Sequence, residues 1–335
     1  MSFMWSPATV LTLSTLITST LMALSSTNWM FLWTSMELNL LSFIPILMMS
    51  KSNAETEGSI KYFLAQALGS ALLLTSSIMM WSPHTILPWA MPAILTTSIL
   101  LKLGSAPCHF WYPSVMASIS WISCTILSSW QKLAPLAILV FFIGTASKSM
   151  VPTMAGLNAL IGGIMGMNQS QLRTIMAYSS IGHLGWMMSF MLMNKPMMSM
   201  FYFTIYCSLI IPLFMLFNSM NLMTSKQLSK TPMISPITQM SISILLISLA
   251  GLPPMTGFMP KLLAISMLAA YYTPLIIILI IGSLMNLFFY LNIVINMMAP
   301  NQNMNTNITK YTTKDNMLLL LSSATSMGLA PMIML

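Results

Sequence analysis

Four ionisable side chains, Glu37, Lys102, Lys132 and Lys261, lie within stretches of sequence that are otherwise apolar. A charge at the centre of a membrane helix costs roughly 2.5–3.5 kcal/mol on insertion scales, so such residues are expected to face a protein interior or a hydrated cavity. Burial disfavours the charged form of a lysine and of a carboxylate, and a nearby opposite charge restores it. These residues could therefore form a chain of proton stations bridged by water and hydroxyl groups.

A structural role competes with proton transfer at each position. Glu37 could cap a helix or pair within a bundle, and Lys261 could be a charge that flanks a helix. Lys102 and Lys132 could extend their ammonium groups to the membrane surface. Against this, the segment "CHFWYPSVMASISW" after Lys102 stays apolar, and Lys132 lies near the middle of a long apolar segment.

Two histidines are candidate relay residues. His183 lies in the middle of the apolar segment "AYSSIGHLGWMM", and His109 follows Lys102 in the break "KLGSAPCH". Histidine titrates near neutral pH, so either side chain could pass a proton. A hydrogen-bonded packing role is the alternative for His183, and an interfacial position is the alternative for His109. His84 is interpreted as a loop residue without a role.

The composition places the chain in a membrane. Of its 335 residues, 57% are hydrophobic and only 5% are charged, whereas a soluble domain carries roughly 25% charged residues. Polar groups cannot cover such a surface, so lipid must be the solvent. The formal net charge of +8 comes from basic residues that are scattered singly, which favours membrane-flanking charges over a nucleic-acid interface.

Neither a metal site nor a dinucleotide site is indicated. Cys108, Cys124 and Cys207 are far apart in apolar sequence and form no pattern with the histidines, so we interpret them as packing residues. The glycines of "ALIGGIMGMN" follow no strand and lack the spacing of a dinucleotide fingerprint. Gly162 and Gly166 instead have the spacing of a helix-packing motif. We expect no cofactor in this chain.

Hydropathy predicts eleven membrane-spanning segments, since a helix needs roughly 20 mostly apolar residues to cross a bilayer, and the fifth and the ninth of these segments are long. The segments are residues 4–24, 29–49, 60–80, 86–106, 115–143, 151–168, 171–192, 197–218, 236–270, 273–298 and 315–334. The connections between them are short, so we expect one membrane domain over residues 1–335 and no soluble domain.

Basic residues in short loops set the orientation of a membrane protein. Counted from the first connection, even-numbered loops carry seven basic residues and odd-numbered loops carry two. The N-terminus shares a side with the even-numbered loops, so we expect it to face the cytoplasm-like or matrix compartment and the C-terminus to lie opposite. The even-numbered loops hold Lys51, Lys61, Arg173, Lys226, Lys230, Lys310 and Lys314, and the odd-numbered loops hold Lys148 and Lys195.

Two of the predicted segments are interrupted. The ninth contains "GLPPMTGFMPK", whose adjacent prolines cannot continue a helix, and the fourth ends at "KLGSAP". The two breaks are five segments apart, an odd number, so a repeat of five helices would be inverted in the membrane. We therefore predict inverted repeats over about residues 1–144 and 150–298, followed by a C-terminal helix at 315–334.

Six segments between about residues 28 and 265 carry a resemblance to a known family. They are "SMELNLLSFIPIL", "TEGSIKYFLAQALGSALLL", "LLKLGSAPCHFWYPSV", "WQKLAPLAIL", "GMNQSQLRTIMAYSSIGHLGWM" and "LAGLPPMTGFMPK". These segments resemble the antiporter-like membrane subunits of mitochondrial NADH:ubiquinone oxidoreductase (respiratory complex I), in particular the subunit 2 family. The resemblance implies an all-α polytopic fold, in a shortened animal form with about eleven helices.

The resemblance also implies a function. In the family, a glutamate and a lysine on neighbouring helices form a pair, and a central lysine and a lysine on the second broken helix continue the proton path. Glu37, Lys102, Lys132 and Lys261 fall on these motif positions. The implied role is proton translocation across the mitochondrial inner membrane, coupled to ubiquinone reduction elsewhere in the complex. Other subunits would bind NADH, FMN, the iron–sulfur clusters and ubiquinone, and neighbouring membrane-arm subunits and lipid would be the partners.

The chain departs from the family pattern at two positions. Ser114 stands where related sequences often carry an acid, which puts an acidic exit group there in doubt, and Leu262 stands where an aromatic residue often follows the lysine. Two other functions stay open: a stand-alone cation–proton antiporter of the same fold, and a structural membrane subunit that does not conduct. The sequon Asn307-Ile308-Thr309 weakly suggests a plasma-membrane protein, but our topology places it on the matrix side.

Overall fold

The computed structural model describes residues 7–49, 52–81, 90–146, 150–225, 227, 236–253 and 255–298. These residues form α-helices and one isolated β-bridge, between Gln171 and Thr224. The helices are α1 (Pro7–Ser25), α2 (Trp29–Leu47), α3 (Asn53–Trp81), α4 (Ala90–Leu103), α5 (Trp111–Ser118), α6 (Trp121–Ser128), α7 (Trp130–Ala146), α8 (Met150–Met167), α9 (Leu172–Leu192), α10 (Pro196–Ser219), α12 (Pro236–Ala250), α13 (Phe258–Leu268) and α14 (Thr273–Met298).

The all-α membrane class predicted from hydropathy is confirmed. Within the described residues, seven spans are long and apolar enough to cross a membrane, and shorter apolar helices accompany them, at 91–103, 238–250 and 258–268. The predicted segment at 315–334, the sequon, His84, and several of the loop lysines (Lys51, Lys148, Lys226, Lys230, Lys310 and Lys314) lie outside the described residues.

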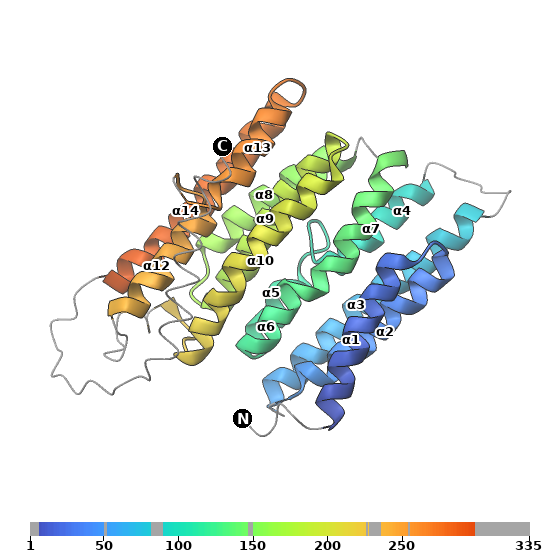
Figure 1. Cartoon of the computed structure of the whole chain (residues 1–335), viewed down its shortest axis with the longest axis horizontal. Coiled ribbons are helices and arrows are strands. Elements are labelled where there is room, and N and C mark those ends of the chain that lie inside the picture. Colours follow the sequence, from blue (N-terminus) through green and yellow to red (C-terminus); the bar gives the residue numbers. More distant parts are fainter. Residues whose placement is uncertain are drawn as a thin grey trace. The chain divides into compact units, whose positions relative to one another are not determined.

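The chain folds as two compact units, Met1–Thr153 and Met154–Leu335. In the first unit, α1 pairs with α2, α3 packs against α2, α4 and α5, and α7 packs against α1, α4 and α6. In the second unit, α9 packs against α10, α13 and α14, and α12 packs against α10 and α14. Figure 1 shows the helices of the first unit in blue to green and those of the second in green to orange.

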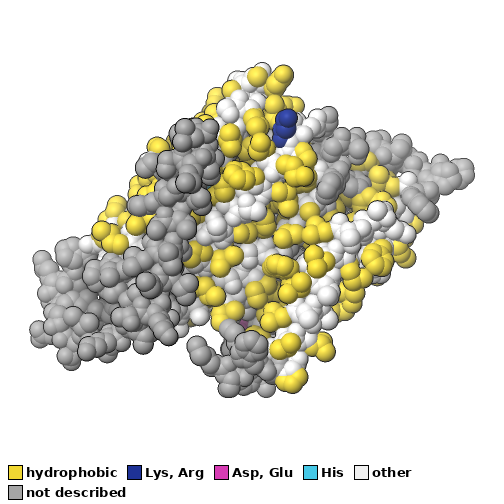
Figure 2. Space-filling model, viewed as in Figure 1, with side chains coloured by type: hydrophobic (Ala, Val, Ile, Leu, Met, Phe, Trp, Pro, Cys, Tyr) yellow, Lys and Arg dark blue, Asp and Glu magenta, His cyan; other side chains and the backbone are white. Residues whose placement is uncertain are grey.

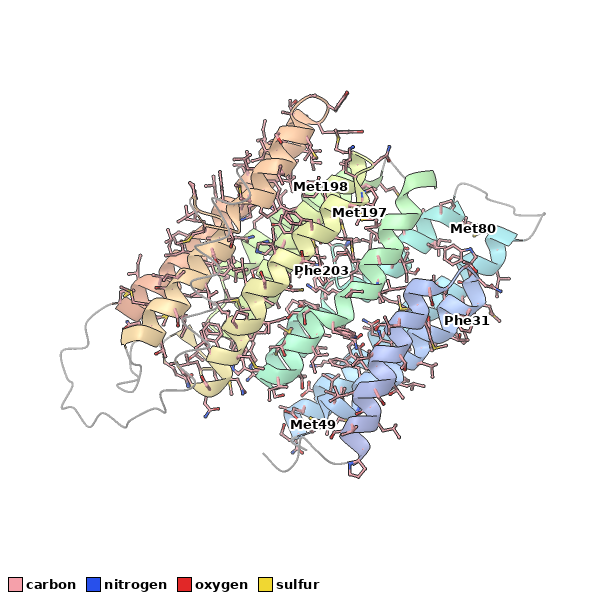
Figure 3. All side chains as sticks on the ribbon, in the orientation of Figure 1. Phe31, Met49, Met80, Met197, Met198 and Phe203 are labelled. Carbon is pink, nitrogen blue, oxygen red and sulfur yellow. The ribbon has the colours of Figure 1, made fainter. Side chains whose placement is uncertain are left out.

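Apolar side chains cover the outer faces of the helices, as expected for a protein in lipid. Phe31 on α2 and Met197 at the start of α10 are exposed, whereas Phe203, further along α10, is buried (Figure 3). On the face shown in Figure 2, hydrophobic side chains are spread widely and basic atoms occupy only a small spot. A surface of this kind needs a bilayer, because a soluble monomer rarely exposes large apolar patches.

Helix α9 lies inside the second unit and has a different composition. Every residue of this helix except Arg173 and Tyr178 is buried. Because protein rather than lipid surrounds it, the helix can carry serines and His183 without exposing a polar group to hydrocarbon. Gly162 of α8 makes this packing close, since a Cβ there would lie 2.6 Å from the backbone nitrogen of Gly182. The packing interpretation of the glycine motif is confirmed.

Among the described residues, each unit contains a helix that is broken near its middle, and both breaks begin with the same backbone cap. Gly104, which directly follows α4, has φ +67°, and Gly251, which directly follows α12, has φ +81°. In each case the next residue donates its backbone N–H to a carbonyl five residues earlier: Ser105 to Leu100, and Leu252 to Ile247. Glycine at the left-handed position of such a cap avoids the steric penalty of a Cβ.

One predicted boundary is wrong. The sequence predicts a single long segment over residues 115–143, but residues 115–118 belong to α5, the second half of the first broken helix. An extended turn at Ser120, with φ −67° and ψ 159°, separates α5 from α6, and residues 121–140 then form the next span. Hydropathy missed this turn because the sequence around it, including Ile119, is as apolar as the helices it joins.

Candidate functional site

Lys102 and Lys132 line the same small cavity in the first unit. The cavity has a volume of about 20 Å³ available to the centre of a water molecule, which is room for at least one water. Both lysines are buried, with 6% and 3% of their surface exposed. The remaining lining residues, which include three amides, come from several helices: Met36, Asn39, Leu40, Tyr62, Gln66, Leu103, Trp111, Tyr112, Leu127, Gln131 and Pro135.

The end of α4 positions Lys102. The helix stops after Leu103, so backbone carbonyls near its end lose their helical partners. Side chains replace these partners: Gln66 of α3 donates to the Lys102 carbonyl at 3.0 Å, and Trp111 of α5 donates to the Leu101 carbonyl at 2.9 Å. The lysine stem lies against Gly69 of α3, where a Cβ would come within 3.0 Å of Cγ of Lys102. The ammonium is therefore directed into protein, not toward the lipid surface.

Lys132 lies in the first turn of α7 and faces an aromatic ring. Its Nζ is 4.6 Å from the centroid of the Tyr112 ring, within the range of a cation–π interaction. The neighbouring Gln131 donates from Nε2 to Oδ1 of Asn39 at 3.0 Å. This hydrogen bond joins α7 to α2, the helix that carries Glu37.

Glu37 is partly buried on α2, between Met36 and Asn39, which line the cavity. Its carboxylate acts electrostatically on the Lys102 ammonium. In the described residues Glu37 and Lys102 are not joined by a direct ion pair, unlike Lys61 and Glu57, which form an exposed one. Glu37 thus influences Lys102 across a gap, and its role in proton transfer stays a prediction.

Lys261 lies in the second unit, at the second helix break. It is buried in the first turn of α13, and its Nζ donates to the backbone carbonyl of Ala250 at 2.8 Å. Ala250 is the last residue of α12, where unpaired carbonyls concentrate partial negative charge. A buried ammonium therefore sits at the negative end of a helix, which compensates part of its desolvation cost.

The two histidines have different surroundings. His183 is buried on α9, and its Nδ1 is 2.8 Å from the hydroxyl of Tyr202 on α10. Its ring also packs against Tyr206, with centroids 5.2 Å apart. His109 is buried in the first break, where Nδ1 is 3.2 Å from the Pro107 carbonyl. His109 does not line the cavity shared by Lys102 and Lys132.

Several polar residues of the site were missed from the sequence. Gln66 and Gln131 are amides in apolar helices, so the argument applied to the lysines could have found them. Tyr112 and Tyr202 had no comparable signal, because tyrosine is common in apolar segments. Ser114 stands at the position where similar sequences often carry an acid. Its hydroxyl donates a hydrogen bond to the Trp111 carbonyl within the same helix, at 2.8 Å.

No metal site is evident in the residues that the structure describes. These residues contain no group of three or more histidine, cysteine or acidic side chains able to hold a metal ion. Cys124 is buried, and Cys108 and Cys207 are half-buried.

These features define a class of protein. Two units of apolar helices, each with a broken helix and a buried lysine beside the break, form a polytopic antiporter-like membrane protein. Residues 26–286 match the family model described as NADH:quinone oxidoreductase/Mrp antiporter, transmembrane. The NADH-ubiquinone oxidoreductase chain 2 of Lumbricus terrestris is 55% identical over 336 residues, which cover 100% of both chains. The chain belongs to the NADH-ubiquinone oxidoreductase chain 2 family, as its motifs suggested.

Solved structures share the fold. A chain of respiratory complex I from Thermus thermophilus superposes with a TM-score of 0.84 at 20% identity, covering 96% of this chain and 77% of that one. A chain of the Mrp complex from a Dietzia species superposes with a TM-score of 0.80 at 14% identity, covering 95% and 74% respectively. At these identities the likeness concerns the fold alone.

Proposed function

We propose that this chain translocates protons across the mitochondrial inner membrane as a membrane-arm subunit of respiratory complex I, driven by ubiquinone reduction elsewhere in the complex. The observation that carries the proposal is the shared cavity of Lys102 and Lys132. Stability does not explain why two buried lysines surround a cavity that can hold water, since burying each lysine costs free energy. They are well explained as two stations between which a proton moves.

The first unit provides the acid and the first two lysines. Glu37 acts on Lys102 without touching it, so a change in their separation would alter how readily Lys102 holds its proton. A proton released by Lys102 would pass through water in the cavity to Lys132. Asn39, Gln66 and Gln131 supply hydrogen-bonding groups around that water, as a polar cavity requires.

The second unit provides the next stations. Lys261 would receive a proton at the second break, where the carbonyl of Ala250 holds its ammonium. His183, bonded to Tyr202, is the relay candidate inside this unit, and His109 is the candidate at the first break. The matching glycine caps of the two broken helices support the inverted repeat over about residues 1–144 and 150–298.

Partners and compartment follow from the family. The relatives are subunits of NADH-ubiquinone oxidoreductase, so the chain would contact neighbouring antiporter-like subunits and lipid. NADH, FMN, iron–sulfur clusters and ubiquinone would bind to other subunits. The N-terminus would face the matrix and the C-terminus the intermembrane space.

The test is replacement of single lysines in the assembled complex. Lys102→Met and Lys261→Met remove a titratable group and keep an unbranched apolar side chain. Protons moved per NADH oxidised should fall several-fold in proteoliposomes, while the complex still assembles. Lys61→Met is the matched control, because Lys61 is an exposed lysine paired with Glu57 at the surface, and it should pump normally. Normal pumping by both buried-lysine variants would refute the proposal.

Two further measurements address the other functions. A stand-alone antiporter, suggested by the fold shared with the Mrp chain, would exchange sodium or potassium for protons when the purified chain alone is placed in liposomes. A structural subunit would leave pumping intact when Lys102, Lys132 and Lys261 are all replaced together. We expect neither result.

A further inference from the structure

Tyr112 connects the first helix break to Lys132. Its ring is 1% exposed and presents its face to the Lys132 ammonium, 4.6 Å from the centroid. The same tyrosine packs against the break itself, because a Cβ on Gly104 would lie 2.8 Å from Cβ of Tyr112. Gly104 is two residues after Lys102, so one side chain touches both the end of the Lys102 helix and the next lysine.

The neighbouring Trp111 anchors this arrangement. Its indole N–H donates to the Leu101 carbonyl at the end of α4, and its ring meets the Tyr112 ring edge to face at 5.6 Å. A shift between α4 and α5 must therefore move the Tyr112 ring as well. Since a cation–π attraction depends on the position of the cation over the ring face, such a shift would change how well Lys132 holds its charge.

We propose that Tyr112 is a positioning residue that stabilises protonated Lys132 and transmits the state of the Lys102 break to it. This rests on the proposed function in proton translocation and adds a residue to it. The aromatic ring is the active element, and the hydroxyl is not required. A ring face suits this task because it attracts the ammonium without accepting its proton, so Lys132 keeps the proton available for the cavity water.

Titratable groups on the helices around Lys132 also contribute to the pH dependence that the experiment measures. Lys102 on α4 and Tyr62 on α3 line the same cavity, and Glu37 lies on α2, which the Asn39–Gln131 bond joins to α7. Helix α6 contributes Cys124, and α1 contributes no titratable side chain. A variant that changes only the Tyr112 ring leaves all of these groups in place.

The experiment compares Tyr112→Phe, which keeps the ring, with Tyr112→Leu, which removes it, in assembled complex reconstituted into proteoliposomes. The readout is the pH dependence of protons moved per NADH oxidised. Without the ring, Lys132 should lose its proton at a lower pH, so the alkaline limb of the Tyr112→Leu profile should move to lower pH by roughly half to one and a half pH units. The Tyr112→Phe profile should stay where it is in the parent complex.

Controls separate this idea from a packing defect and from failure of the proposed function. Phe214→Leu removes a buried ring of α10, in the second unit, that does not line the cavity, and its pH profile should not move. Lys132→Met should abolish translocation. If it does, and the pH profile of Tyr112→Leu is unshifted, the role of Tyr112 is refuted and that of Lys132 stands.

If Lys132→Met pumps normally, the proposed function itself fails at this lysine. Equal shifts in Tyr112→Phe and Tyr112→Leu would assign the effect to the hydroxyl and overturn the proposal.

Discussion

The ammonium of Lys261 donates a hydrogen bond to the backbone carbonyl of Ala250, 2.8 Å away and on the other side of the second helix break. The bond places a buried cation at the C-terminal end of α12, where the helix dipole favours positive charge. It also explains why a glycine follows Ala250. Gly251 has φ +81°, and a Cβ at this position would lie 2.8 Å from Nζ of Lys261.

We expect Gly251→Ala to impair proton translocation more than a distant glycine substitution. The left-handed backbone costs a residue with a Cβ about 1–2 kcal/mol, and the added methyl group must displace the Lys261 ammonium from the Ala250 carbonyl. The measurement is the amount of assembled complex together with protons moved per NADH oxidised. Protons per NADH should fall several-fold in the complex that does assemble.

Gly156→Ala is the matched control for this variant. Gly156 lies in α8, and the nearest atom to an added Cβ, on Ile278, would be an ordinary contact at 3.4 Å. This substitution should leave both assembly and pumping unchanged. If Gly251→Ala pumps as well as Gly156→Ala, the Lys261–Ala250 bond has no part in transport.

The sequence predicted the fold well and the site only in part, for separate physical reasons. Membrane spans are set by apolar length, which is local, so the spans and the break at Gly251 could be read from hydropathy and proline. The buried lysines could be found because a charge in an apolar segment is conspicuous. The Tyr112–Lys132 contact and the Lys102–Lys132 cavity could not, because they depend on how α5, α4 and α7 pack, which no local pattern records.

The hydrogen bond between Gln131 and Asn39 gives a second prediction. Asn39→Leu or Gln131→Met alone leaves a buried or half-buried amide without this partner and should destabilise the first unit by about 1–3 kcal/mol. Replacing both together removes both polar groups, so assembly should largely recover. The double variant should still pump poorly, because an apolar lining does not hold water. The measurements are thermal stability of the assembled complex and protons per NADH.

Recovery of both stability and pumping in the double variant would contradict this prediction. It would mean that the two amides serve only to join α2 to α7. Failure of the double variant to recover any stability would instead show that Asn39 and Gln131 do not act on stability through each other.

A third prediction separates a relay from a packing role for His183. His183→Gln keeps a side chain that can hydrogen-bond to the Tyr202 hydroxyl, but glutamine does not titrate. If His183 carries a proton, this variant should assemble and lose most of its translocation, whereas a packing histidine would tolerate the change. Tyr202→Phe should lower stability by about 1–3 kcal/mol because it removes a buried hydrogen-bond partner. The exposed Tyr271→Phe should have no effect on either measurement.

The last prediction concerns orientation. Asn53 at the start of α3 and Lys195 before α10 are both exposed, and the topology predicted from the sequence assigns them to opposite sides of the membrane. The predicted loops on the side of Asn53 carry seven basic residues and those on the other side carry two, Lys148 and Lys195 itself, so the basic side should be the matrix. In a background without Cys108, Cys124 and Cys207, Lys195→Cys should react with an impermeant maleimide in mitoplasts. Asn53→Cys should react only in inside-out particles, where the matrix face is accessible. The reverse labelling pattern would invert the proton path, because Glu37, Lys102 and Lys132 would then be approached from the opposite compartment.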